Sequence, residues 1–71
     1  MTISEAKAAF KEQCPIRCGG ITYQHISALI YRRKPDGSGL TLQVELLDRG
    51  GNSVTIAAPD RIERGTNNVK I

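Results

Sequence analysis

The residues of this 71-residue chain whose types and spacing could do metal or redox chemistry are two cysteines and one histidine. Cys14 and Cys18 stand in the stretch CPIRC, and His25 follows seven positions later. Structural zinc sites usually take four ligands and pair their cysteines at C-x2-4-C spacing, but here only His25 could join the one pair. The stretch also differs from the C-x-x-C signature of thioredoxin-like redox sites.

Geometry leaves a disulfide between Cys14 and Cys18 open. In an extended chain their Cα atoms would lie about 13 Å apart, too far for a bridge, whereas a turn would bring them together. Free cysteine is among the most buried residue types and behaves as a small hydrophobe. We therefore expect two reduced, apolar cysteines and no metal or cofactor. A thiol or metal site at Cys14, Cys18 and His25 is the alternative.

Catalysis is not expected from this sequence. With one histidine, and no Ser or Asp at a recognisable motif spacing, no catalytic triad can be built. A domain of this length buries only about 60% of the surface its unfolded chain exposes, which leaves little room for a catalytic pocket. We expect a non-catalytic protein.

The best functional candidate is the basic stretch YRRKPDG, which begins at Tyr31. Arginine side chains match the geometry of phosphate, and a tyrosine ring can stack on a nucleic-acid base. The alternative is a solvated strand end whose charges keep a sheet edge from pairing. The net charge of +3 is too weak a field to identify a ligand alone. The candidate nucleic-acid-binding residues are Tyr31, Arg32, Arg33 and Lys34, with Arg61 and Arg64 if they lie on the same side.

One helix, over about residues 3–13, begins the chain. Thr2 and Glu5 have the T-x-x-E spacing of a capping box, in which each side chain bonds the backbone of the other. Ile3, Ala6 and Phe10 recur at helical spacing and form one apolar stripe. Pro15 ends the helix.

The rest of the chain alternates with the period of strands, separated by turns rich in glycine. Strands are predicted over about 21–33, 40–48 and 53–58, a one-turn helix over about 59–63 and a short strand over about 69–71. A further strand is possible at 16–20. Ile26, Ala28 and Ile30 are expected to share one face of the first of these strands, and His25, Ser27, Leu29 and Tyr31 the other. The residues expected to point inward are Leu40, Leu42, Val44 and Leu46, then Val54, Ile56 and Ala58.

This order predicts one α+β domain over residues 1–71, mainly β, with the N-terminal helix packed on a small, strongly bent antiparallel sheet. Short strands with a one-turn helix before the last resemble the small SH3-like barrels, and the leading helix resembles their Sm-like variant. The glycines at 19 and 20 suit a sharp bend. The alternative is an open three- to four-stranded meander with one helix.

The stretches CPIRCGGITYQHISALIYRR and VTIAAPDRIERG also carry a resemblance over most of the chain. They resemble small uncharacterised proteins encoded on conjugative transposons and prophages of Gram-positive bacteria. That resemblance implies an accessory role on a mobile element and brings no activity or site residues.

We therefore expect a cytoplasmic binding or adaptor module, since the chain begins with no secretory signal and contains no membrane-spanning stretch. Its partner is nucleic acid, bound without sequence readout, or another protein. The alternative to nucleic-acid binding is a protein-interaction module or a homo-oligomer.

Overall fold

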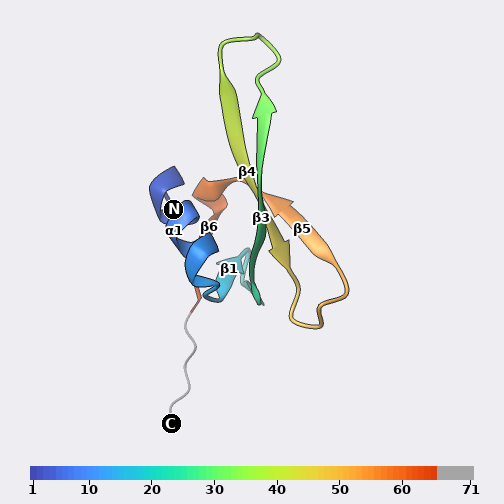
Figure 1. The fold of residues 1–71 in the computed structure, drawn as a ribbon. Helices are drawn as coiled ribbons and strands as arrows, with labels where there is room; N and C mark the ends of the chain where they lie inside the picture. The colour runs from blue at the N-terminus through green and yellow to red at the C-terminus, as the bar shows by residue number, and fades with distance from the viewer. Residues whose placement is uncertain (66–71) are drawn as a thin grey trace.

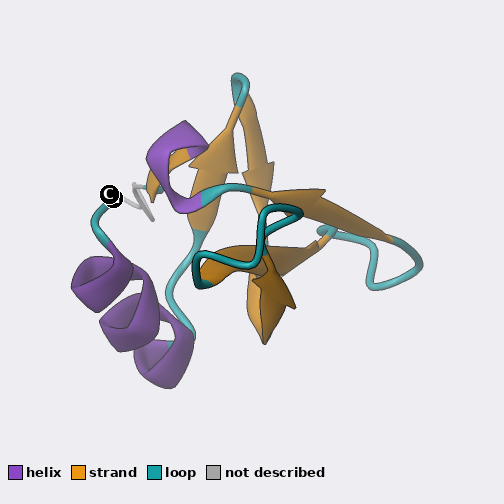
Figure 2. Ribbon diagram, turned by 90° about the horizontal axis from the view of Figure 1, so that it is seen from above, coloured by secondary structure: helices purple, strands orange, loops and turns teal. Residues whose placement is uncertain are grey.

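The computed structural model describes residues 1–65, which form one helix, six short strands and one turn of 3-10 helix. The strands make two three-stranded antiparallel sheets (Figure 1). In the view from above, the helix lies to one side of the strands (Figure 2). The elements in chain order are α1 (Ile3–Glu12), β1 (Ile16–Cys18), β2 (Ile21–Tyr23), β3 (His25–Arg33), β4 (Leu40–Leu47), β5 (Val54–Ala57), η1 (Pro59–Arg61) and β6 (Ile62–Arg64).

Helix α1 begins at the capping box that the sequence predicts. The Glu5 backbone N–H donates to Thr2 Oγ1 at 3.1 Å, and the Thr2 N–H donates to Glu5 Oε1 at 2.8 Å. At the other end, Gln13 adopts a left-handed conformation with φ of 57° and bonds Ala9 O. The buried face of the helix consists of Ala6 and Ala9, so a sheet can approach its backbone closely.

The first sheet has the strand order β2-β1-β6. Strands β1 and β2 are joined by Gly19 and Gly20, which both have positive φ, 60° and 81°, as a tight hairpin turn requires. Strand β6 corrects the sequence prediction, which continued a helical turn to residue 63. The 3-10 helix ends at Arg61, and Ile62 is already extended, buried and opposite Cys18 of β1.

The second sheet is the meander β3-β4-β5. The sequence predicts one strand over about 21–33, but the structure divides this segment between the two sheets. Tyr23 pairs with Ile16 in the first sheet, whereas the N–H of the next residue, Gln24, donates to Leu47 O in the second. The chain therefore bends at Gln24, because it leaves one sheet to join the other.

A bulge at Ser27 changes which side chains of β3 face the core. Ile26 lies opposite Leu46, and Ala28 lies opposite Glu45, so Ser27 has no partner in the register. After the bulge, Leu29 shares the buried face, and Ala28 and Ile30 share the outer one. The prediction that Ile26, Ala28 and Ile30 share a face is therefore wrong, because the extra residue inverts the alternation.

The orientation predicted for β5 is also wrong. Val54 and Ile56 are 48% and 43% exposed, and Ala57 is the buried residue. The register with β4 explains this, because Ala57 lies opposite the buried Val44 while Ile56 lies opposite the outward-facing Glu45.

The core lies between α1 and the two sheets. Of the residues expected to point inward from β4, Leu42, Val44 and Leu46 are buried, whereas Leu40 is 58% exposed beyond the end of the core. Met1 also connects the start of the chain to η1 and β6, since its amino nitrogen donates to Pro59 O and Ile62 O. The buried cluster comprises Ala6, Ala9, Ile16, Tyr23, Ile26, Val44, Leu46, Ala57 and Ile62.

The predicted α+β, mainly β class is confirmed, with two small antiparallel sheets in place of the single bent sheet. The two sheets do not close into a barrel within residues 1–65. The strand predicted at 69–71 lies outside the part of the chain that the structure describes. In that described part, no helix has the length and apolar character needed to cross a membrane.

Candidate nucleic-acid interface

The β3–β4 hairpin extends beyond the rest of the molecule as a two-stranded ribbon. Strand β5 pairs with β4 only at residues 44–47, so residues 30–33 of β3 and 40–43 of β4 have only each other as strand neighbours among residues 1–65. Figure 1 shows this hairpin protruding past α1 and β5. We call residues 30–43 the ribbon.

A well-bonded turn closes the tip of the ribbon. The Lys34 N–H donates to Gly39 O at 2.9 Å, and the Gly37 N–H donates to Lys34 O at 3.0 Å. The Ser38 N–H donates to Asp36 Oδ1 at 2.9 Å, and this bond lowers the pKa of the Asp36 carboxyl. The turn therefore fixes its one carboxylate within its own loop.

The basic residues of the ribbon point to both of its faces. Arg32 lies opposite Thr41 on the outer face, and its Nε donates to Gln43 Oε1 at 2.7 Å. Arg33 lies opposite Leu40 on the other face. All three cations, Arg32, Arg33 and Lys34, are exposed. The single ion pair within residues 1–65 lies elsewhere, so no carboxylate neutralises the ribbon's cations there.

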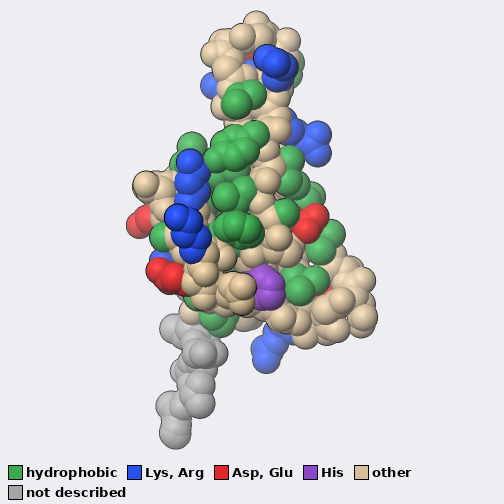
Figure 3. Space-filling model, in the orientation of Figure 1, with side chains coloured by type: hydrophobic (Ala, Val, Ile, Leu, Met, Phe, Trp, Pro, Cys, Tyr) green, Lys and Arg blue, Asp and Glu red, His purple; other side chains and the backbone are tan. Residues whose placement is uncertain are grey.

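Lys7 of α1 adds a fourth cation beside the ribbon. Its Nζ lies 5.9 Å from the centre of the Tyr31 ring, a cation–π geometry, and the ring remains 51% exposed. Sequence analysis did not identify Lys7, because a contact between residues so far apart leaves no local pattern. Lys and Arg atoms lie around the hairpin and along α1 in the space-filling view (Figure 3).

An open, largely apolar groove lies beside the ribbon, between the start of α1, the start of β4 and η1. Ile3 and Leu40 line it and are more than half exposed. Lys34 and Asp60 also line this groove, so one charged residue of each sign stands beside an apolar surface.

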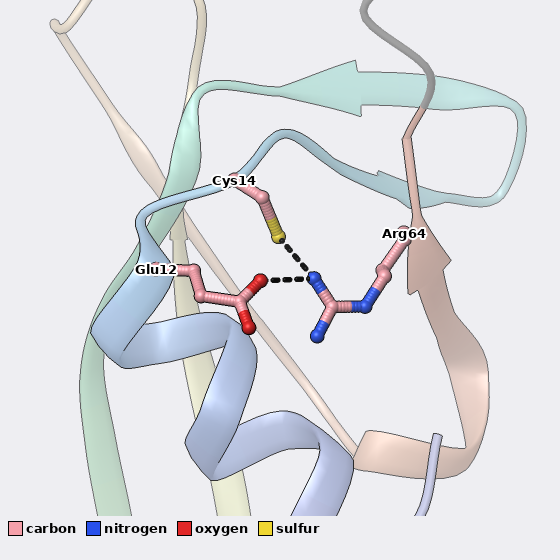
Figure 4. Close-up of polar contacts among 3 residues, drawn as sticks. All are labelled: Glu12, Cys14 and Arg64. Atoms are coloured by element: carbon pink, nitrogen blue, oxygen red, sulfur yellow. Dashed lines mark hydrogen bonds and ion pairs between the residues drawn. The ribbon is translucent and has the colours of Figure 1, made fainter.

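Arg64 is not part of the ribbon. Its Nη1 donates to Glu12 Oε1 at 2.5 Å and to Cys14 Sγ at 3.2 Å, at the end of α1 (Figure 4). The hydrogen bond that Arg64 donates to the Glu12 carboxylate, and the nearby Cys14 side chain, raise the pKa of Arg64. Its charge is therefore already matched by a carboxylate.

Arg61 also lies apart from the ribbon cations. It lines a shallow depression next to the first sheet, together with Arg17 and the glycine turn at 19 and 20. Asp60 and Glu63 line the same depression. The structure thus brings Tyr31, Arg32, Arg33 and Lys34 together and leaves Arg61 and Arg64 outside that group.

The cysteines and the histidine do not assemble into one site. Cys14 and Cys18 are both free and half-buried, and they pack against the core. His25 begins β3 in the second sheet, where its register partner is Leu47. Over residues 1–65, no group of three or more His, Cys, Asp or Glu side chains could hold a metal ion.

Comparison with protein-family models, with curated proteins and with solved structures finds no match to this chain.

Proposed function

We propose that the chain is a non-catalytic module that binds nucleic acid without sequence readout, through the basic ribbon. The observation that carries this proposal is the protruding hairpin whose cations Arg32, Arg33 and Lys34 have no carboxylate partner within residues 1–65.

The shape of the ribbon suits a nucleic-acid groove. The major groove of B-form DNA, about 12 Å wide, admits a two-stranded β-ribbon. Arg32 and Arg33 point to opposite faces, so each can reach the phosphates of a different strand. Lys7 and Lys34 widen the positive surface on the face of Arg33.

The tip of the ribbon, residues 35–39, carries little that could read bases. Its side chains are short, and the Asp36 carboxylate is bonded to the Ser38 backbone. Contacts to the phosphate backbone of nucleic acid position a protein on it but carry no sequence information. We therefore expect affinity in the range of non-specific binding, about 10⁻⁴ to 10⁻⁶ M at physiological salt.

Salt dependence tests this proposal. The double substitution Arg32→Gln and Arg33→Gln removes two phosphate contacts, so the slope of log K against log salt becomes shallower by up to about 1.8 for duplex DNA. The matched control is Arg17→Gln with Arg49→Gln, because these arginines are also exposed and their loss changes the net charge equally. Equal losses in the two double variants would contradict a site on the ribbon.

An amide NMR titration locates the contact. We expect a short mixed-sequence duplex to shift the resonances of residues 31–39 at low salt, with the shifts fading as salt rises. A matched single strand shows whether the ribbon needs a groove. Shifts confined to residues 61–65, or none, would contradict this assignment.

We further propose that this module serves as an accessory protein of a bacterial mobile element. This part is supported by the sequence resemblance of the stretches that begin at Cys14 and Val54. Neighbouring genes for conjugation or integration would support the role. A setting among chromosomal metabolic genes would contradict it.

A further inference from the structure

Strand β5 is an edge strand with aliphatic side chains in solvent. Among residues 1–65 it pairs only with β4 and is the last strand of the second sheet. Val54, Thr55 and Ile56 are all exposed, and the two aliphatic side chains are 48% and 43% exposed. In Figure 1, β5 lies on the side of the sheet away from α1.

The polar backbone groups at this edge follow from the ladder. The Asp48 N–H donates to Ser53 O at 3.0 Å, so this pair is a hydrogen-bonded one. Hydrogen-bonded pairs alternate with non-hydrogen-bonded pairs along an antiparallel ladder. The backbone N–H and C=O groups of Thr55 and Ala57 therefore also point toward β4. The N–H and C=O groups of Val54 and Ile56 consequently point away from the sheet.

This edge also lacks the devices that normally block pairing. Native edge strands carry charges, proline or bulges that prevent another strand from adding. Residues 50–58, which include all of β5, contain neither an ionisable side chain nor a proline. The register of β5 on β4 is regular.

We propose that β5 is a dimerisation edge, on which a second copy of this chain adds its own β5 in antiparallel orientation. In the favoured register, Thr55 lies opposite the second copy's Thr55 on a two-fold axis, and Val54 lies opposite the second copy's Ile56. This register pairs all four outward N–H groups with outward C=O groups. It also places the exposed aliphatic side chains of both copies on one face, where they contact each other.

A second copy fits this edge because the segment is complementary to itself. Shifting the register by one residue would place Val54 and Ile56 opposite side chains of the other face. Since no charged residue lies in β5, two copies meet without repulsion between like charges across the strands. The two second sheets then become one six-stranded sheet.

The size of the contact predicts a weak dimer. Interfaces that bury less than about 1,200 Å² in total belong to weak or transient complexes, and four residues a side fall within that class. We expect sedimentation analysis to show a monomer at about 10 µM and a substantial dimer fraction at about 1 mM. A monomer throughout this range would overturn the proposal, whether or not the ribbon binds nucleic acid.

Substitution of Ile56 tests the edge itself. Ile56→Pro removes an outward N–H and leaves the ladder with β4 intact, because proline is tolerated where the N–H faces solvent. The control Ile56→Thr keeps that N–H. We expect the proline variant to remain monomeric and the threonine variant to dimerise more weakly than the parent. Equal dimerisation of the proline variant and the parent would overturn the proposal.

The unsubstituted chain provides a test that no folding defect can obscure. In an equal mixture of isotope-labelled and unlabelled protein, we expect intermolecular NOEs between Val54 and Ile56 side chains of different copies. A dimer whose intermolecular NOEs come from other residues would overturn the proposal.

Discussion

Arg64 of β6 and Glu12 of α1 form an ion pair, with Nη1 of the arginine 2.5 Å from Oε1 of the glutamate. The pair joins residues 52 positions apart and connects the last described strand to the end of the helix. Their side chains are 45% and 55% exposed, so solvent screens the attraction.

We therefore expect Arg64→Gln to change the melting temperature little. It should also weaken nucleic-acid binding less than Arg32→Gln does, because Glu12 already matches the charge of Arg64. Thermal melts followed by circular dichroism and fluorescence anisotropy with labelled DNA, at one ionic strength, measure both effects. Equal losses of affinity in the two single variants would contradict the placement of the site on the ribbon.

The capping box predicts a loss of stability in acid. The pKa of the Glu5 carboxyl is lowered below its ordinary value of 4.5, mainly by the hydrogen bond from the Thr2 backbone N–H and to a smaller extent by the Thr2 side chain. A carboxyl whose pKa is lower in the folded chain stabilises the fold fully above the unfolded value, and this contribution disappears as the pH falls through the folded value. Stability should therefore fall as the pH drops below 4.5.

Glu5→Gln should reduce this dependence on pH without abolishing it. The pKa values of Asp36 and Asp48 are also lowered, by bonds with Ser38 and Ser53 respectively. Urea unfolding across the acid range measures the free energy of unfolding for both proteins. Identical pH profiles for the variant and the parent would show that Glu5 contributes nothing to the loss of stability in acid.

Ile16 should be among the most sensitive positions for stability, because it is fully buried between the helix and the sheets. Ile16→Val should lower the free energy of unfolding by about 0.5–1.5 kcal/mol, and Ile16→Ala by about 2–5 kcal/mol. The control is Ile21→Ala in β2, where the side chain is 58% exposed and the change should stay within about 0.5 kcal/mol. Urea unfolding measures all three, and equal losses at the two positions would contradict this packing.

Zinc should leave the protein unchanged. Cys18 lies in the first sheet and His25 in the second, and Cys14 contacts Arg64. We expect equimolar zinc to shift no amide resonances of these residues and to leave both thiols reactive toward a thiol reagent. Protection of Cys14 and Cys18 together would restore the metal-site hypothesis.

The sequence predicted those parts of the fold that depend on neighbouring residues. The spacing of Thr2 and Glu5 identified the start of the helix, and alternation identified Leu42, Val44 and Leu46 as core residues. The bend at Gln24, strand β6 and the orientation of β5 depend on pairing between distant segments. Alternation alone cannot show which face of a strand is buried, since a shift of one residue reverses it.

In the candidate site, too, local sequence signals predicted some features and contacts between distant residues determined the others. Arg32, Arg33 and Lys34 were placed beside a hairpin tip because a local turn signal follows them. Tertiary contacts then added Lys7 and separated Arg64 from the group. Such contacts between distant residues produce no spacing that sequence analysis can detect.

The bulge at Ser27 gives the chain one residue that it can lose. Ser27 donates to Glu45 Oε1 at 2.8 Å and to Glu45 O at 3.2 Å, but it has no partner in the register. Deleting it would make β3 regular and keep Ile26 and Leu29 on the buried face. Deleting Leu29 would instead turn the rest of the strand over. In a scan of single-residue deletions along β3, the deletions of Ser27 and of Ala28 should therefore still fold, because each leaves one residue between Ile26 and Leu29. Length variation in this strand is thus tolerated at the bulge.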